Sequence, residues 1–288
     1  MLNKSVRVDV SGDQKAIMIS KLCNNLCLMC HSHTNYSDDY KFHHIDSALD
    51  KIDGSEKVIQ ISGGEPTIRK DFLKILSKIK LKNSDAIIQV NTNGRMFFYN
   101  DFTSKCMGFV DVVMTELHGL EDTHDKITQV VGSFRQTCKG ITNLFENGIN
   151  IQIVVLVNRL NFMELPDLAN FLKSEYPFVQ VSFHYTWFKR NAYENRDILF
   201  VKISDIVEYL QKAADILGEK CSFKHFPACI FDENYRGYLV KQTFVIDDRE
   251  FHPLNDCFLC SIRDECGGIW RNYFDLGGNK SEFRPKYG

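Results

Sequence analysis

The sequence predicts an α/β fold in which helices flank a parallel sheet. Strand-like and helix-like segments alternate along most of the chain, which favours a parallel sheet covered by helices. The strand-like segments are long apolar runs rich in Val and Ile, as expected of strands that are buried on both faces. Distinctive polar motifs follow these segments, as in barrels whose chemistry lies at the C-terminal ends of the strands.

The predicted elements form six strand–helix repeats. Apolar residues recur at helical spacing between the strands, and Asn147-Gly148 is a typical helix C-terminus. A last helix begins near Ser204, its expected N-cap, and a short strand is expected at 238–246. The predicted strands are 16–20, 57–62, 86–91, 110–117, 149–157 and 179–185, and the predicted helices are 71–80, 133–146, 164–173 and 204–217.

Size and charge narrow the function classes. A chain of 288 residues is long enough for one large domain, or for a medium and a small one. The net charge of −2 gives no reason to expect nucleic acid or an anionic membrane as a partner. The N-terminus lacks a signal-peptide pattern, and the longest apolar run, 149–157, is about half a membrane span. The sequence therefore predicts a cytoplasmic protein. Because several of its ten cysteines are spaced like metal ligands, they are expected to bind metal rather than form disulfides.

Two motifs point to a metal cofactor. Cys23, Cys27 and Cys30 follow the first predicted strand with three and then two residues between them. Three thiolates can converge on one 4Fe–4S cluster. Such a cluster is usually held by four thiolates, so one of its irons would lack a protein ligand. The segment from Gly63 to Thr67, Gly-Gly-Glu-Pro-Thr, follows the second predicted strand. A structural zinc knuckle is the alternative reading of the three cysteines.

In this order and at this distance, the two motifs resemble the radical S-adenosylmethionine (SAM) enzymes. The resemblance covers about residues 16–190 and implies a partial (β/α)6 TIM barrel. It also implies a 4Fe–4S cluster held by the three cysteines, with SAM chelating its fourth iron. Reduction by a partner such as flavodoxin or ferredoxin would cleave SAM to a 5′-deoxyadenosyl radical, while the protein positions the cofactor.

The resemblance also assigns further positions. By this resemblance, Gly63 and Gly64 bring the backbone close to the amine of SAM, and Glu65 lies beside that amine. The segment Thr92-Asn93-Gly94 ends the third strand near the ribose of SAM. Met29 replaces the usual aromatic residue, and Glu116 replaces a small hydroxyl residue. The alternative for Thr92-Asn93-Gly94 is a plain strand-end turn. For Glu116 and His118 it is a solvated loop, and for Trp187 it is a place in the core. The implied cofactor-binding residues are Met29, Gly63, Gly64, Glu65, Thr92, Asn93, Glu116 and Trp187, and the candidates for substrate or proton handling are His118 and His124.

A second cysteine set lies near the C-terminus. Cys257, Cys260 and Cys266 are separated by two and five residues, and Cys229 lies 28 residues upstream of Cys257. This set resembles the twitch and SPASM extensions of radical SAM enzymes, although Trp270 stands where a SPASM run continues with cysteine. The resemblance implies one auxiliary 4Fe–4S cluster with four cysteine ligands. A four-cysteine zinc site, or substitution of one ligand by Cys221, stays open.

These inferences predict a core at 1–190, a bridging helix at 191–220 and a twitch-like domain at 221–288. The expected function is oxidative modification of a peptide, by crosslinking or side-chain oxidation. A separate leader-binding protein is a candidate partner. A small-molecule dehydrogenase acting on a sugar or aminocyclitol is the alternative. A non-catalytic metal-binding scaffold is a second alternative.

Overall fold

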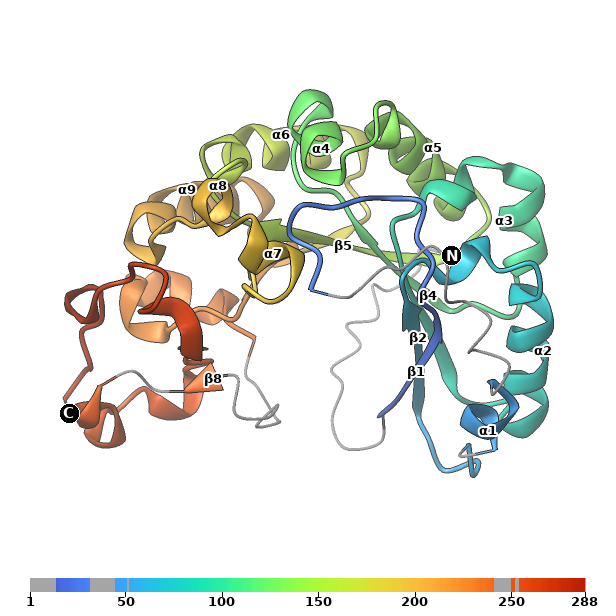
Figure 1. The fold of residues 1–288 in the computed structure, drawn as a ribbon, viewed down its shortest axis with the longest axis horizontal. Helices are drawn as coiled ribbons and strands as arrows, with labels where there is room; N and C mark the ends of the chain where they lie inside the picture. Colours follow the sequence, from blue (N-terminus) through green and yellow to red (C-terminus); the bar gives the residue numbers. More distant parts are fainter. Residues whose placement is uncertain (1–13, 32–44, 51, 241–249, 252–253, 288) are drawn as a thin grey trace. The chain divides into compact units, whose positions relative to one another are not determined.

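The computed structural model describes residues 14–31, 45–50, 52–240, 250–251 and 254–287 (Figure 1). Strands and helices alternate through most of this range, as the sequence predicts. The strands are β1 (Gln14–Ser20), β2 (Val58–Gly63), β3 (Ile87–Thr92), β4 (Val112–Glu116), β5 (Asn150–Val157), β6 (Gln180–Tyr185), β7 (Cys221–Lys224), β8 (Glu250–Phe251) and β9 (Ile269–Trp270). The helices are α1 (Ile45–Leu49), α2 (Phe72–Lys82), α3 (Asn100–Cys106), α4 (Glu121–Thr128), α5 (Ser133–Glu146), α6 (Leu165–Glu175), α7 (Asn191–Glu194), α8 (Arg196–Leu199) and α9 (Ile203–Leu217).

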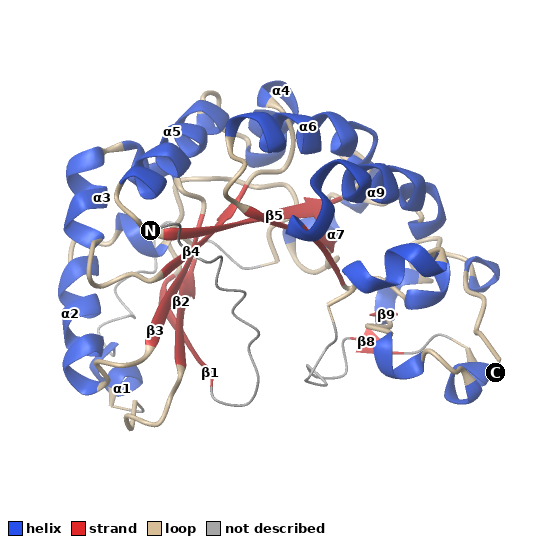
Figure 2. Cartoon of the chain, turned by 180° about the vertical axis from the view of Figure 1, so that it is seen from behind, coloured by secondary structure: helices blue, strands red, loops and turns tan. Residues whose placement is uncertain are grey.

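Seven strands form one sheet in the order in which they occur in the chain, β1 to β7. Figure 2 shows β1 to β4 of this sheet lying together. The β1–β2, β2–β3, β3–β4 and β6–β7 pairs are parallel. The predicted α/β fold is therefore confirmed, but the predicted count of six strands is too low. The sequence did not reveal β7 because it has only four residues and no long apolar run. A separate antiparallel pair joins β8 to β9.

Contacts divide the chain into two compact units. The first comprises 1–27, 32–117 and 124–153, and the second comprises 28–31, 118–123 and 154–288. The predicted boundaries at 190 and 220 stay predictions, although β7 already lies beyond residue 220 and pairs with β6. Most of the strand expected at 238–246 lies outside the described residues, and Leu239 forms only an isolated bridge with Phe223. None of the described helices is both long and apolar enough to cross a membrane.

In the first unit, both the helices and the strands bury apolar side chains. Phe72, Ile75, Leu76 and Ile79 of α2 are buried, and Figure 1 shows α2 and α3 along one side of the strands. Val58, Ile59 and Ile61 of β2 are buried as well. Burial of such side chains is the main stabilising term for a layer of helices on a sheet.

Helix α5 coincides with the predicted segment 133–146. It ends at Glu146 with Asn147 as its C-cap, and Gly148 follows with φ of +73°, a conformation that glycine adopts without strain. Close packing explains why a glycine, Gly140, stands in the middle of α5. A Cβ at this position would lie 2.4 Å from the carbonyl oxygen of Gly94. Helix α5 therefore packs directly against the turn that follows β3.

The start of α9 differs from the prediction. Ser204 is not the N-cap, because the helix begins at Ile203. The first amides bind side chains from the C-terminal segment instead: Ile203 N donates to Tyr273 Oη at 2.8 Å, and Ser204 N donates to Glu282 Oε2 at 3.1 Å. Helix N-terminal amides need such acceptors, and here residues distant in sequence supply them.

Candidate active site

The first cysteine motif lies in the loop after β1. The side chains of Cys23, Cys27 and Cys30 are partly exposed, and none forms a disulfide. In the first unit, Asn25 N donates to Cys23 Sγ at 3.4 Å, and Leu26 N donates to the carbonyl oxygen of Thr128 at 3.0 Å. These bonds fold the segment between Cys23 and Cys27 into a bend. Ligation of a cluster by the three thiols stays a prediction.

The glycine pair at the end of β2 lies against the start of this loop. Gly64 N donates to the carbonyl oxygen of Ser20 at 2.8 Å, and Glu65 N donates to that of Leu22 at 2.6 Å. A Cβ on Gly64 would lie 2.2 Å from the same Leu22 oxygen. A Cβ on Gly63, whose φ is +151°, would lie 2.3 Å from the Ser20 oxygen. The glycines are thus required by backbone packing within the protein, apart from any contact with a cofactor.

We expect Gly64→Ala to destabilise the protein by about 1–3 kcal/mol, because the new methyl group meets backbone atoms that can move only by displacing the cysteine loop. Urea unfolding and equilibrium dialysis with SAM would measure the lost stability and the weaker binding. Gly237→Ala is the control, since a Cβ there would meet nothing within 4 Å. Equal unfolding midpoints and SAM affinities for the two variants would contradict the prediction.

Glu65 is fully buried and ties the end of β2 to the end of β3. Its Oε1 accepts hydrogen bonds from Thr67 N, Thr67 Oγ1 and Thr92 Oγ1 at 3.0, 2.5 and 2.7 Å, and Oε2 accepts one from Asn93 N at 2.7 Å. Burial raises the pKa of Glu65, while the hydrogen bonds from Thr67, Asn93 and Thr92 act in the opposite direction. The structure thus brings the predicted residues Glu65, Thr92 and Asn93 together.

Asn93 also connects the β3 turn to the cysteine loop and to α5. Its Nδ2 donates to Asn24 Oδ1 at 2.6 Å, and its carbonyl oxygen accepts from Thr137 Oγ1 at 2.9 Å. Gly94 has φ of +79°, and a Cβ there would lie 2.4 Å from Thr115 Oγ1. The segment from Thr92 to Gly94 is therefore more than an exposed strand-end turn, although its predicted contact with the ribose stays untested.

Sequence reasoning missed Arg95, which follows this turn. Its Nη1 donates to the carbonyl oxygen of Asn24 and to Asn25 Oδ1, and its Nε donates to Gln136 Oε1. An arginine in a strand–helix connection is common on protein surfaces. No local pattern distinguishes this one, because the residues that it binds lie about 70 and 41 positions away.

The second unit contains Met29 and Trp187, two of the residues that the resemblance implies bind the cofactor. Met29 is buried, and Asn195 Nδ2 donates to the carbonyl oxygen of Leu28 at 3.2 Å. Trp187 is partly exposed and stacks on Trp270 with a centroid distance of 5.3 Å. These are the two tryptophans of the chain. Trp187 thus has a packing partner, while its contact with a cofactor stays a prediction.

The remaining candidates differ in burial: Glu116 ends β4, His118 follows it, and His124 lies in α4. Glu116 is partly exposed, whereas His118 and His124 are buried. His118 Nδ1 accepts a hydrogen bond from Leu156 N at 3.3 Å, and its carbonyl oxygen accepts one from Asn161 Nδ2 at 2.7 Å. His124 packs edge-on against Phe134 at a centroid distance of 6.0 Å. Both histidines are therefore buried and held by neighbouring residues, and a role in proton handling stays a prediction for either.

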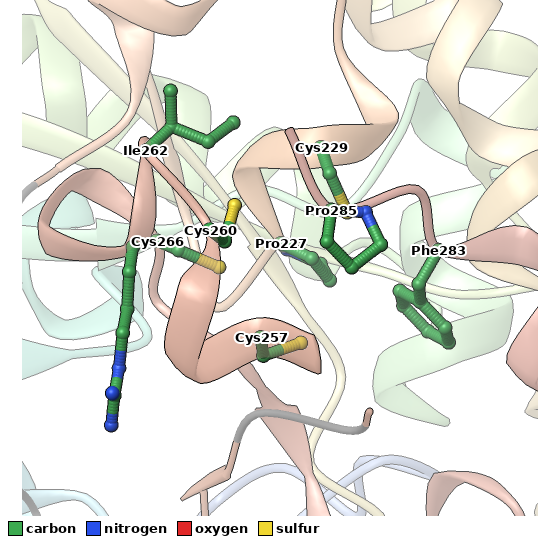
Figure 3. Close-up of a pocket in the computed structure, with 9 residues that line it drawn as sticks. Pro227, Cys229, Cys257, Cys260, Ile262, Cys266, Phe283 and Pro285 are labelled. Atoms are coloured by element: carbon green, nitrogen blue, oxygen red, sulfur yellow. The ribbon is translucent and has the colours of Figure 1, made fainter. Parts of the chain in front are cut away.

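The structure brings the four C-terminal cysteines around one cavity in the second unit (Figure 3). Cys257, Cys260 and Cys266 line it together with Cys229, which lies in a different segment. The cavity has a volume of about 20 Å³. Burial raises the pKa of the Cys229 thiol to about 11 and also raises that of Cys266. Cys257 is buried and the other three cysteines are partly exposed. Metal binding stabilises the thiolates that burial disfavours, so thiols that line one cavity are candidate ligands of a cluster.

The four-cysteine set fits the implied auxiliary cluster in number and type of donor. Within the part of the chain that the structure describes, no three His, Cys, Asp or Glu side chains are grouped closely enough to hold a single metal ion. Cys221 is buried in β7 and does not line the cavity. Burial raises the pKa of the Cys221 thiol. Its position is that of a core residue of the sheet.

Comparison with known proteins identifies the family. Residues 17–172, more than half of the chain, match the radical SAM superfamily. The chain therefore belongs to the radical SAM superfamily, and it is an enzyme of that class. Membership implies a 4Fe–4S cluster and SAM as cofactors, with a reductant and a substrate as partners. The membership of the radical SAM superfamily that the sequence motifs predicted is therefore confirmed.

The curated relatives are longer than this chain. Fe-coproporphyrin III synthase of Methanosarcina barkeri is 24% identical over 228 residues, which are 76% of this chain and 55% of that protein. GTP 3′,8-cyclase of Helicobacter pylori is 24% identical over 214 residues, which are 71% of this chain and 64% of that protein. The chain thus spans less than two thirds of the length of either relative.

Solved structures share the fold. Streptococcus suis SuiB bound to the precursor peptide SuiA superposes with a TM-score of 0.55 at 15% identity, covering 72% of this chain and 46% of that chain. Native anSMEcpe with bound SAM and the Kp18Cys peptide superposes with a TM-score of 0.55 at 13% identity, covering 95% of this chain and 93% of that chain. At these identities the likeness concerns the fold alone.

Proposed function

We propose that this radical SAM enzyme oxidises a peptide substrate and that its C-terminal cysteines hold an auxiliary 4Fe–4S cluster. The observation that carries the proposal is the convergence of Cys229, Cys257, Cys260 and Cys266 on one cavity. Four thiolates saturate the irons of a cluster, which suits electron transfer better than substrate ligation. An oxidation needs such an electron acceptor besides SAM.

In the proposed mechanism, Cys23, Cys27 and Cys30 hold the SAM-binding cluster, and the glycine turn with Glu65 orients the methionine end of SAM. When bound, cluster and SAM supply a radical that abstracts a substrate hydrogen atom. The protein's own part is geometric. Gly64 and Glu65 are tied by their amides to Ser20 and Leu22, so the presumed SAM cradle and the cysteine loop keep a fixed spacing.

The peptide substrate is supported by the structural neighbours. Two of them were solved with a peptide bound, SuiB with SuiA and anSMEcpe with Kp18Cys. The anSMEcpe chain matches almost end to end, so its length and arrangement of elements resemble those of this chain. These enzymes bind peptides on the shared fold, and we carry that property over as a proposal.

A small-molecule substrate is the second candidate. The names of the sequence relatives favour it, since GTP 3′,8-cyclase and Fe-coproporphyrin III synthase act on small molecules. The sugar or aminocyclitol dehydrogenation expected from sequence belongs to the same class.

The experiment that separates the candidates is an anaerobic assay with reconstituted enzyme, SAM and a chemical reductant. One arm contains short peptides encoded beside the gene, and the other contains GTP, coproporphyrin III or an aminocyclitol. We expect 5′-deoxyadenosine together with a peptide that has lost two hydrogen atoms, as mass spectrometry would show. Turnover of a small molecule with unchanged peptides would refute the peptide proposal and favour the second candidate.

A further inference from the structure

Arg95 connects the end of β3 to the bend between Cys23 and Cys27. Its Nη1 lies 2.7 Å from Asn25 Oδ1 and also binds the carbonyl oxygen of Asn24. Both acceptors belong to the three-residue segment that separates the two cysteines. We propose that Arg95 is a positioning residue that holds this bend for the cluster and places a permanent positive charge beside it.

The guanidinium group is itself held in place. Its Nε donates to Gln136 Oε1 of α5 at 2.6 Å. Helix α5 is fixed to the same turn, because Thr137 Oγ1 binds the carbonyl oxygen of Asn93 and Gly140 packs on Gly94. A planar guanidinium with three such contacts is pre-organised, whereas a lysine ammonium could replace only part of them.

Arg95 supplies a hydrogen bond to a buried side-chain oxygen of the bend, Asn25 Oδ1. Asn25 is 3% exposed, so its Oδ1 has no access to bulk water if the arginine is removed. An unsatisfied buried oxygen is unfavourable, and the bend would rearrange to relieve it. Two other contacts, from Asn93 to Asn24 and from Leu26 to Thr128, would remain. Loss of Arg95 should therefore loosen the loop without unfolding the unit.

The charge has a separate consequence. A guanidinium group stays protonated throughout the accessible pH range. Reduction adds an electron to the cluster, and a nearby fixed positive charge stabilises the more negative form. Net charge and hydrogen bonding around a cluster are among the factors that set its reduction potential. Arg95 therefore makes the cluster easier to reduce, which favours electron delivery by the reductant partner.

The test compares Arg95→Gln, which removes the positive charge, with Arg95→Lys, which keeps the charge but lacks the planar set of N–H donors of the guanidinium group. Iron per chain is followed while a chelator is present, and EPR-monitored titration gives the midpoint potential. Addition of SAM identifies the signal of the first cluster, because SAM binds its open iron. We expect both variants to lose this cluster severalfold faster than the wild type. Arg95→Gln should lower its midpoint potential, and Arg95→Lys should leave the potential nearly unchanged.

Arg135→Gln is the matched control, because Arg135 is an exposed arginine next to Gln136 on the same helix. Circular dichroism checks the fold of each variant. If Arg95→Gln retains iron and potential like Arg135→Gln, the proposal is overturned. If Arg95→Gln does not fold, Arg95→Lys carries the test, and wild-type iron retention in that variant overturns the proposal. The inference rests on the cluster implied by the family and not on the peptide substrate, so the two fail independently.

Discussion

Replacement of Cys27 by alanine should abolish the formation of 5′-deoxyadenosine. The first cluster has three predicted thiolate ligands, and loss of one leaves two irons without a protein ligand, which the open-corner geometry does not tolerate. We expect about four fewer irons per chain after anaerobic reconstitution, and no SAM cleavage above background. Iron analysis and chromatography of the reaction products measure both effects.

Cys138→Ala is the control for this prediction. Cys138 is a partly exposed cysteine on α5 that belongs to neither set, so the chemical change is the same but no ligand is lost. It should keep full iron and full SAM cleavage. If Cys27→Ala produced as much 5′-deoxyadenosine as Cys138→Ala, the assignment of the first site would fail, and the catalytic role of this loop with it.

The sequence predicted the elements whose signals are local. The limits of α5 agree residue for residue, because its apolar periodicity and the Asn147-Gly148 terminus are both strong. The first strand, predicted at 16–20, is observed as Gln14–Ser20, and the glycine turn lies at the end of β2, because Val- and Ile-rich runs mark both strands. Strand β7 was missed, since four residues that begin with a cysteine carry no strand pattern of their own. What makes them a strand is pairing with β6.

In the candidate site too, the residues with a recognisable motif were predicted, and those that depend on distant partners were not. Spacing singled out the cysteines and the family resemblance singled out Glu65, and the structure adds the four hydrogen bonds that this carboxylate accepts. The roles of Arg95 and of the α9 cap could not be predicted, because each depends on partners that are far away in sequence. His118 and His124 were candidates because they follow a strand, but sequence does not report that both are buried. Long-range packing decides such cases.

The second large effect concerns Cys257, which is 9% exposed and lines the four-cysteine cavity. Under the proposed function, the auxiliary cluster accepts the electron that leaves the substrate radical. Cys257→Ser should therefore remove about four irons, keep at least part of the SAM cleavage, and suppress the oxidised product. Iron analysis, 5′-deoxyadenosine release and product mass are measured on the same preparation, with the substrate that the peptide or small-molecule assay identifies.

Folding must be separated from electron transfer, because a cluster can hold together a small region that has little apolar core of its own. Circular dichroism and SAM affinity of Cys257→Ser are therefore compared with those of Cys221→Ala, which alters a cysteine that does not line the cavity and should keep all of its iron. A folded Cys257→Ser protein without the second cluster that still forms full product would show that the cluster is only structural. A wild-type product that is not oxidised relative to its substrate would also end the electron-acceptor role, and a SAM-consuming rearrangement would then explain the chemistry better.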